Sequence, residues 1–335
     1  MIKIIDSFYL NEFFDMKKIN VLVCTDDNYV PQCGIMLTSL FVNNKSNNLQ
    51  IFVLSEEINE NNKRLLFNTA NNYGVDMHFV SIDKDMLQGF DNTIKLGDHV
   101  SLAAYYRLFC SNILPQDIDK VLYLDCDIII NTNIADLYNY NIDNYALAGV
   151  IDENYFFSEY YDRLDLDRNV ITYINSGVLL INLNYWRKYN VTSRCVDCVH
   201  SIPQKLLFHD QDTLNVVLKN EINYLPITWN FQTAFLYCIN QEKYEENILK
   251  EINSIINNPS IIHYTGTSKP WFSSCYHPYK NYYLYYKAMS EWRDWKLIRS
   301  ESSVSKIKRA FYNIFCYLGI LKKKETYIIK PIMKG

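Results

Sequence analysis

Two aspartates separated by one residue are the strongest chemical signal in this sequence of 335 residues. Asp125 and Asp127 follow the apolar run at residues 121–124, which is typical of a buried strand, and they precede three isoleucines at 128–130. Burying unpaired charge is costly, so two acids at a strand end need something that offsets their repulsion. A divalent cation held by both carboxylates would do so; the alternative is a solvated turn. We predict a metal site here.

His263 is a candidate third ligand, because it follows an apolar Ile-Ile pair and begins a polar loop. The loop also carries Gly266, which permits close backbone approach, and Lys269, which could meet a phosphate. The alternative for a lone histidine is a satisfied core or loop residue. A ligand set of oxygens and an imidazole favours Mn²⁺, with Mg²⁺ next. The sequence has no Walker-type glycine–lysine motif, so we expect a diphosphate site of another type.

The elements that must position these residues alternate between strands and helices. Apolar runs predict strands at 19–24, 51–54, 77–80, 121–124, 145–150 and 177–183. Helical patterns lie between and after these strands. One helix begins at Pro31, a second, after the strand at 51–54, ends near Gly74, and others lie at 101–113, 210–218 and 282–297. This alternation predicts parallel β-α-β units whose ligands gather at the carboxyl ends of the strands. The expected fold is therefore α/β, with a mainly parallel, Rossmann-like sheet.

Length and composition indicate one large domain with appendages. A hydrophobic content of 49% is ample for a packed core. We divide the chain into an N-terminal extension (1–18), a catalytic domain (19–272), a helical extension (273–300) and a basic amphipathic tail (301–335). No secretory signal and no apolar run of membrane-spanning length is present in the sequence, so we expect a cytoplasmic protein.

The net charge of −4 conceals a strong asymmetry. From Ser302 onward the chain has eight Lys or Arg residues and one acid, a net +7 that leaves −11 for the remainder. An acidic body argues against general nucleic-acid binding. Apolar residues spaced by three and four between Val304 and Leu321 predict an amphipathic helix. This helix would place the protein peripherally on the cytoplasmic face of an anionic membrane or, alternatively, pack back onto the acidic body.

Six motifs in a fixed order carry a family resemblance. They are CTDDNY at 24–29, YYRL at 105–108, VLYLDCD at 121–127, NSGVLLINL at 175–183, DQD at 210–212 and HYTGTSKPW at 263–271. Over residues 19–272 the chain resembles glycosyltransferase family 8. These are retaining enzymes that include bacterial lipopolysaccharide α-galactosyl- and α-glucosyltransferases and, more distantly, glycogenin. The resemblance implies a GT-A type nucleotide-diphospho-sugar transferase domain and a UDP-sugar donor.

The resemblance also implies a role for each matching residue. Asp26 and Asn28 would hold the uracil, Tyr29 would stack on it, and Cys24 and Thr25 belong to the same nucleotide loop. By the same resemblance, Mn²⁺ would be bound by Asp125, Asp127 and His263, and the diphosphate would contact Gly266 and Lys269. The donor sugar would be surrounded by Arg107, Asn175, Asp210 and Gln211. The acceptor would lie near His99 and Asp152. For Asp210, an N-cap of the following helix is the alternative.

The implied reaction moves glucose or galactose from UDP onto a saccharide, lipid-linked or glycoprotein acceptor. Retention could arise by double displacement or by front-face attack with the leaving phosphate as base. The neutral amide of Gln211 is a poor nucleophile, which favours front-face attack. Two other functions are the alternatives. One is a sugar-phosphate nucleotidyltransferase, which would carry a glycine-rich loop after the first strand. The other is a non-catalytic nucleotide-sugar-binding protein. Turnover of a UDP-sugar separates an enzyme from a binding protein.

Overall fold

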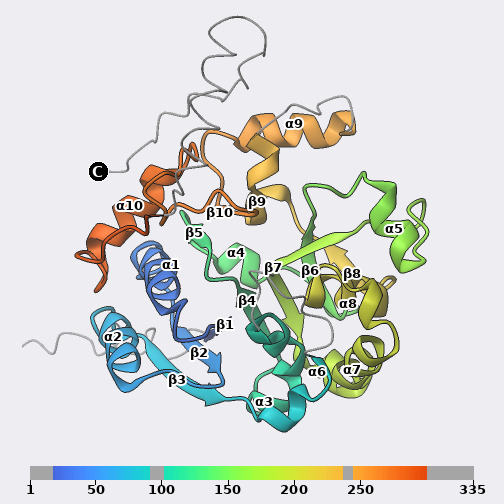
Figure 1. Ribbon diagram of the computed structural model, residues 1–335, viewed down its shortest axis with the longest axis horizontal. Helices are drawn as coiled ribbons and strands as arrows, with labels where there is room; N and C mark the ends of the chain where they lie inside the picture. Colours follow the sequence, from blue (N-terminus) through green and yellow to red (C-terminus); the bar gives the residue numbers. More distant parts are fainter. Residues whose placement is uncertain (1–17, 91–101, 237–243, 300–335) are drawn as a thin grey trace, which may run out of the picture.

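A seven-stranded sheet forms the centre of the protein (Figure 1). The computed structural model describes residues 18–90, 102–236 and 244–299. In spatial order the strands are β3 (Asp76–Ser81), β2 (Leu49–Ser55), β1 (Ile19–Cys24), β4 (Lys120–Leu124), β7 (Ile174–Asn182), β6 (Leu147–Ile151) and β8 (Ile222–Tyr224). Only β7 runs antiparallel to its neighbours in this sheet. The expected α/β fold with a mainly parallel sheet is confirmed, and the reversed strand β7 is an addition.

Helices cover both faces of this sheet (Figure 1). They are α1 (Val30–Asn43), α2 (Glu60–Asn71), α3 (Cys110–Ile113), α4 (Ala135–Tyr138), α5 (Ser158–Leu164), α6 (Leu183–Lys188), α7 (Val191–Ser201), α8 (His209–Val217), α9 (Glu246–Ile255) and α10 (Lys280–Met289). Strand β1 alternates between two cores: Val21 and Val23 pack in one, with α1 and α10, whereas Leu22 and Cys24 pack in the other, with α7 and α8. Burial on both faces explains why this strand is a continuous apolar run.

A smaller three-stranded sheet brings His263 to the acids. Its order is β5 (Ile128–Ile130), β10 (Ile261–His263) and β9 (Phe231–Gln232), with β10 antiparallel to β5. His263 pairs with Ile128, and the Tyr264 backbone N–H donates to the Asp127 carbonyl at 3.0 Å. His263 is therefore the last residue of a strand, where its ring is held more firmly than in the loop that the sequence suggested.

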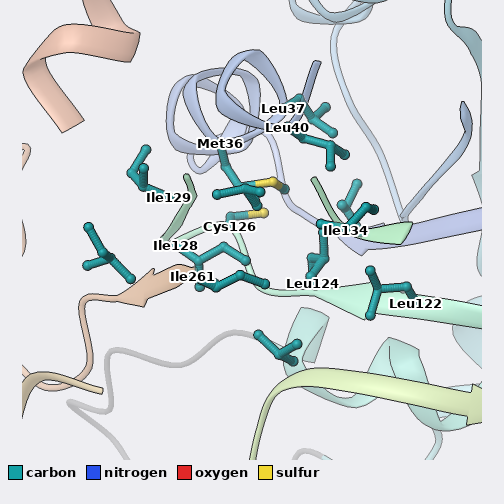
Figure 2. Packing of buried hydrophobic residues seen from close by; sticks show 14 of the residues in the cluster. Met36, Leu37, Leu40, Leu122, Leu124, Cys126, Ile128, Ile129, Ile134 and Ile261 are labelled. Atoms are coloured by element: carbon teal, nitrogen blue, oxygen red, sulfur yellow. The ribbon is translucent and has the colours of Figure 1, made fainter. Parts of the chain in front are cut away.

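The residue between the two acids faces the core (Figure 2). Cys126 is buried among side chains of α1 and of the strands on either side of it, and its thiol donates to the Cys24 carbonyl at 3.3 Å. Figure 2 shows Cys126 beside Met36 and Ile128. Because Cys126 is anchored inward, the acids on either side of it are left at the edge of the sheet, at 24% and 17% side-chain exposure for Asp125 and Asp127.

Some expected elements differ in detail. The helix expected at 101–113 is a 3₁₀ segment, η4 (Leu102–Phe109), followed by the single turn α3. Helix α10 ends at Met289, well before residue 297, and it packs on α1 in the same core as the sheet. The 1–17 segment, His99 and the tail from 300 onward lie outside the described residues. Within the described part, no helix is both long and apolar enough to span a bilayer.

Candidate active site

Asp125, Asp127 and His263 converge as the sequence predicted. Their ligand atoms lie within 4.8 Å of one another, and His263 Nε2 is 3.2 Å from Asp127 Oδ1 and 3.8 Å from Asp125 Oδ2. The three residues come from two sheets: the acids follow β4, and the histidine ends β10. Two carboxylates and one imidazole suit Mn²⁺ or Mg²⁺, and among the described residues this is the one such cluster. The residues present therefore fit a divalent cation.

The charges in this cluster are mutually dependent. Lys269 Nζ donates to Asp127 Oδ2 and to the Tyr264 carbonyl. Burial opposes ionisation of Asp127, but Lys269 and His263 outweigh it and hold the pKa of Asp127 below its usual range. Burial likewise opposes protonation of His263, yet Asp127 and then Asp125 raise the pKa of its imidazole. Lys269 and His263 thus offset part of the negative charge of the two acids.

Arg107 joins the cluster of Asp125, Asp127 and His263 to the residues expected at the donor sugar. The guanidinium is buried at 5% exposure; Nη2 lies 3.0 Å from Asp125 Oδ1, and Nε lies 3.2 Å from Asp210 Oδ2. Nη1 donates to the Ser176 carbonyl at 2.7 Å, and the guanidinium carbon sits 4.0 Å above the centre of the Tyr123 ring. Four contacts hold the Arg107 guanidinium in place, so its position sets the separation between Asp125 and Asp210.

Asp210 does not act as the helix cap. The N-cap of α8 is Phe208, whose backbone N–H donates to Asp212 at 2.7 Å. Asp212 is completely buried and also accepts from Arg163, at 2.7 and 2.9 Å, and from the Tyr173 hydroxyl at 2.6 Å. Asp210 is buried, its Oδ2 is paired with Arg107 Nε at 3.2 Å, and no side chain caps the start of α8. The N-cap alternative for Asp210 is therefore wrong.

Burial shapes the acidity of Asp210. It raises the pKa of this carboxyl to about 6, with Arg107 opposing the shift and Asp125 adding to it. Next to it lie the other residues expected at the sugar. Gln211 Nε2 donates to Asp152 Oδ2 at 3.2 Å, and Asn175 Nδ2 donates to Gln211 Oε1 at 3.0 Å. Asp152, expected nearer the acceptor, therefore contacts the same amides that were expected at the donor sugar.

The nucleotide loop follows β1 and is closed by its own hydrogen bonds. Asp26 Oδ1 accepts the backbone N–H groups of Asn28 and Tyr29 at 2.9 and 3.0 Å. Thr25 and Cys24 are buried beneath, whereas Tyr29 is 36% exposed. Tyr29 meets Trp271 edge to face with centroids 5.9 Å apart, and Lys269 Nζ lies 5.8 Å from the same indole. The loop at the end of β1 and the loop after β10 are thus joined through Trp271.

Gly266 occupies a backbone conformation that favours glycine. Its φ is +69°, and nothing lies within 4 Å of the position that a Cβ would take. The glycine is therefore required by the left-handed turn rather than by crowding. This turn precedes Lys269 and directs the loop back across the metal cluster.

Three further residues of the site were missed by sequence reasoning. Asn230 is fully buried and contacts both His263 and Asn175. Gly177 lies against His263 and Asp125. The Cβ of an alanine at this position would lie 2.3 Å from His263 Cε1 and 2.8 Å from Asp125 Oδ2. Glu153 accepts from the Thr265 hydroxyl at 2.9 Å and from the Ala234 N–H, and burial followed by Asp152 raises its pKa to about 7. The signal for Asn230 was a polar residue inside the mostly apolar stretch at 227–236.

Solved structures share this architecture. The galactosyltransferase LgtC, solved with donor and acceptor sugar analogues, aligns with a TM-score of 0.72 at 22% identity, over 87% of this chain and 100% of that one. At this identity the likeness concerns the fold. It defines the fold class of this chain as α/β, of the GT-A type.

Sequence comparison then identifies the family. The model of glycosyl transferase family 8 matches residues 20–275. General stress protein A of Bacillus subtilis (strain 168) is 31% identical over 282 residues, which are 82% of this chain and 94% of that protein. Lipopolysaccharide 1,2-glucosyltransferase of Escherichia coli (strain K12) is 27% identical over 296 residues, 88% and 85% of the two chains. The chain belongs to glycosyltransferase family 8, which confirms the resemblance and the expected enzyme class, a hexosyltransferase.

Proposed function

We propose that the protein is a retaining glycosyltransferase that moves glucose or galactose from a UDP-sugar to a saccharide, lipid-linked or glycoprotein acceptor in the presence of Mn²⁺ or Mg²⁺. The observation that carries this proposal is the convergence of Asp125, Asp127 and His263 beside a buried Arg107, which is paired with both Asp125 and Asp210. A divalent ion bound there would offset the negative charge of a diphosphate. The names of the relatives, a glucosyltransferase and a galactosyltransferase, support a hexose donor.

Charge complementarity supports the assignment of the two ends of the donor. As UDP departs, negative charge grows on its β-phosphate, and Lys269 would stabilise that charge as it develops. The sugar becomes positively charged at the same moment. Ionised Asp210, at the sugar end and held beside Arg107, would stabilise the oxocarbenium-like centre. A cation at the expected position of the leaving group and an anion at that of the sugar support the proposal.

The arrangement of Gln211 favours front-face attack. Its Oε1 accepts from the Asn175 amide at 3.0 Å and from the Ser176 backbone N–H at 3.1 Å, so its lone pairs are occupied. A double displacement through this oxygen would break both bonds. In the front-face reaction the acceptor hydroxyl oxygen bonds to the anomeric carbon, the bond to the phosphate oxygen breaks, and the proton passes to that phosphate. The product keeps the α-configuration.

A screen of UDP-sugars tests the proposal directly. UDP release should be seen with UDP-glucose or UDP-galactose and Mn²⁺, should cease with EDTA, and should be lost in Asp127→Ala while its circular dichroism is unchanged. UDP with Mn²⁺ should also raise the melting temperature more than ADP or GDP does. Binding of UDP-sugar without any turnover, or activity that survives chelation, would contradict the proposal. A product with a β-linkage by proton coupling would reject retention.

A further inference from the structure

A buried chain of hydrogen bonds links the metal cluster to the sugar residues. His263 Nδ1 lies 2.8 Å from Asn230 Oδ1, and Asn230 Nδ2 donates to Asn175 Oδ1 at 2.8 Å. Asn175 Nδ2 in turn donates to Gln211 Oε1 at 3.0 Å. Exposure along this chain is 4% for His263, 0% for Asn230, 7% for Asn175 and 9% for Gln211. Asn230 lies between His263 and Asn175 and comes from η6 (Ile227–Asn230), an element that carries none of the residues expected in the site.

Two backbone N–H groups of β7 fix the direction of this chain. The Gly177 N–H donates to Asn175 Oδ1 at 3.0 Å, and the Ser176 N–H donates to Gln211 Oε1 at 3.1 Å. A backbone N–H can only donate, so each amide must turn its oxygen toward β7. Both anchors give the same orientation, because Asn175 Nδ2 then meets Gln211 Oε1. Neither Asn175 nor Gln211 can flip its side-chain amide without losing a bond to the backbone.

The orientation of Asn175 determines the orientation of Asn230. Since Asn175 Oδ1 accepts, Asn230 must present its NH₂ to it and its Oδ1 to His263. An amide oxygen cannot donate, so the proton must reside on His263 Nδ1. The lone pair of the neutral ring is then on Nε2, the nitrogen that faces Asp125 and Asp127. This is the tautomer that a metal ligand requires, and a hydrogen bond from the other ring nitrogen is the usual means of selecting it.

We propose that Asn230 is a positioning residue for both ends of the donor site. Its Oδ1 selects the His263 tautomer that turns Nε2 toward the metal, and its Nδ2 holds Asn175 against Gln211 at the sugar. The inference rests on the proposed function for the identity of the ligands. It makes a separable claim about this chain: one amide should affect metal affinity through its oxygen and turnover through its nitrogen.

Two substitutions separate the two roles. Asn230→Ala removes both contacts, so Mn²⁺ affinity in the presence of UDP, measured by calorimetry, should fall about 10–100-fold. Asn230→Asp keeps an acceptor for His263 but turns a carboxylate oxygen toward Asn175 Oδ1. Its Mn²⁺ affinity should return close to that of the wild type, while kcat stays well below it. A purely structural role would lower both measures together in both variants.

Asn44→Ala is the matched control. Asn44 is also a buried asparagine, at 1% exposure; its Oδ1 accepts the Ile134 N–H at 2.9 Å, and its Nδ2 donates to the Leu40 carbonyl at 2.9 Å. It lies at the end of α1, outside the site. Losing these bonds should lower the melting temperature without changing Mn²⁺ affinity. If Asn230→Ala is folded and binds Mn²⁺ as tightly as the wild type, the inference is overturned and the proposed function stands. If the wild-type protein binds neither Mn²⁺ nor UDP, both the inference and the proposed function are contradicted.

The tautomer can be measured without any substitution that threatens folding. In ¹⁵N spectra of the wild-type imidazoles, recorded at alkaline pH where the rings are neutral, the His263 signals are assigned by their loss in His263→Gln. We expect the proton on Nδ1, which supports the inference. A neutral ring with the proton on Nε2 would overturn it whatever the Asn230 variants do.

Discussion

Asp210 is a carboxylate whose surroundings favour its protonated form. Burial raises its pKa from 3.8 to about 6, and the partial compensation from Arg107 is weakened by Asp125. The folded protein therefore holds this proton more tightly than the unfolded chain. The resulting stability is fully present below about pH 4 and is lost as the pH rises toward 6. At neutral pH the ionised group is a cost to folding, as functional groups often are.

Asp210→Asn should expose that cost. The variant resembles the protonated form, so its urea midpoint should exceed that of the wild type at pH 7.5, and the difference should shrink at pH 4.5. Its kcat should fall by about 10²-fold or more, because a neutral amide stabilises a cationic sugar poorly. Urea unfolding at both pH values and initial rates at pH 7.5 measure these effects. A wild type that is the more stable protein at pH 7.5 would show that the Arg107 pair outweighs burial.

Gly177 shows how closely the cluster is packed. An alanine Cβ would lie 2.3 Å from His263 Cε1 and 2.8 Å from Asp125 Oδ2, so the ligands must move apart. Gly177→Ala should lower Mn²⁺ affinity by about tenfold or more and destabilise the fold by about 1–3 kcal/mol. Calorimetry with Mn²⁺ and UDP, beside urea unfolding, separates the two effects.

Gly149→Ala is the comparison for that prediction. Its Cβ would meet the Ile174 Cδ1 and a Leu179 methyl at 2.8 and 3.2 Å, so crowding falls on aliphatic side chains. A similar loss of stability with unchanged Mn²⁺ affinity is expected. If both variants lose affinity equally, the effect comes from general strain in the sheet rather than from displaced ligands.

At the scale of elements, the turn that follows helix α10 packs closely on α1 because position 34 is a glycine. A Cβ on Gly34 would lie 1.8 Å from Cζ3 of Trp292, which is buried at 5% exposure. Gly34→Ala should therefore expel the indole and cost about 1–3 kcal/mol. Red-shifted tryptophan emission, relative to a Trp292→Phe reference, and a lower melting temperature would report it. An unshifted spectrum would mean that α10 accommodates the methyl by sliding along α1.

The whole molecule has an uneven distribution of charge, with a basic segment after residue 301 and an acidic remainder. We propose that residues 302–335 attach the protein to an anionic membrane, where each Lys or Arg adds about 1 kcal/mol. Deleting them should abolish sedimentation with phosphatidylserine vesicles at low salt and leave UDP release in solution unchanged. A truncated protein that unfolds, or a full chain that ignores such vesicles, would instead indicate that the tail packs on the body.

Much of this protein could be predicted from local sequence. Strands β1, β2 and β4 are apolar runs that end next to polar residues, and burial on both faces makes that pattern easy to detect. The candidate ligands Asp125, Asp127 and His263 were predicted because they follow apolar runs, and the structure brings them together. Their binding of a metal, and the roles of Lys269 and Tyr29 at the donor, stay predictions.

Tertiary structure alone decided how the site is oriented. Strand β7 runs against its neighbours, and its Ser176 N–H donates to Gln211 Oε1 across 35 positions of sequence. Asn230 reaches Asn175 across 55 positions of sequence, and Asp212, rather than Asp210, receives the N–H at the start of α8. The hydrophobic periodicity of a sequence indicates which side of a helix or strand is buried. The hydrogen-bond partners of a side chain depend instead on which elements become neighbours in space. That choice is made by packing of the whole chain, so the direction of each amide is fixed only when the chain has folded.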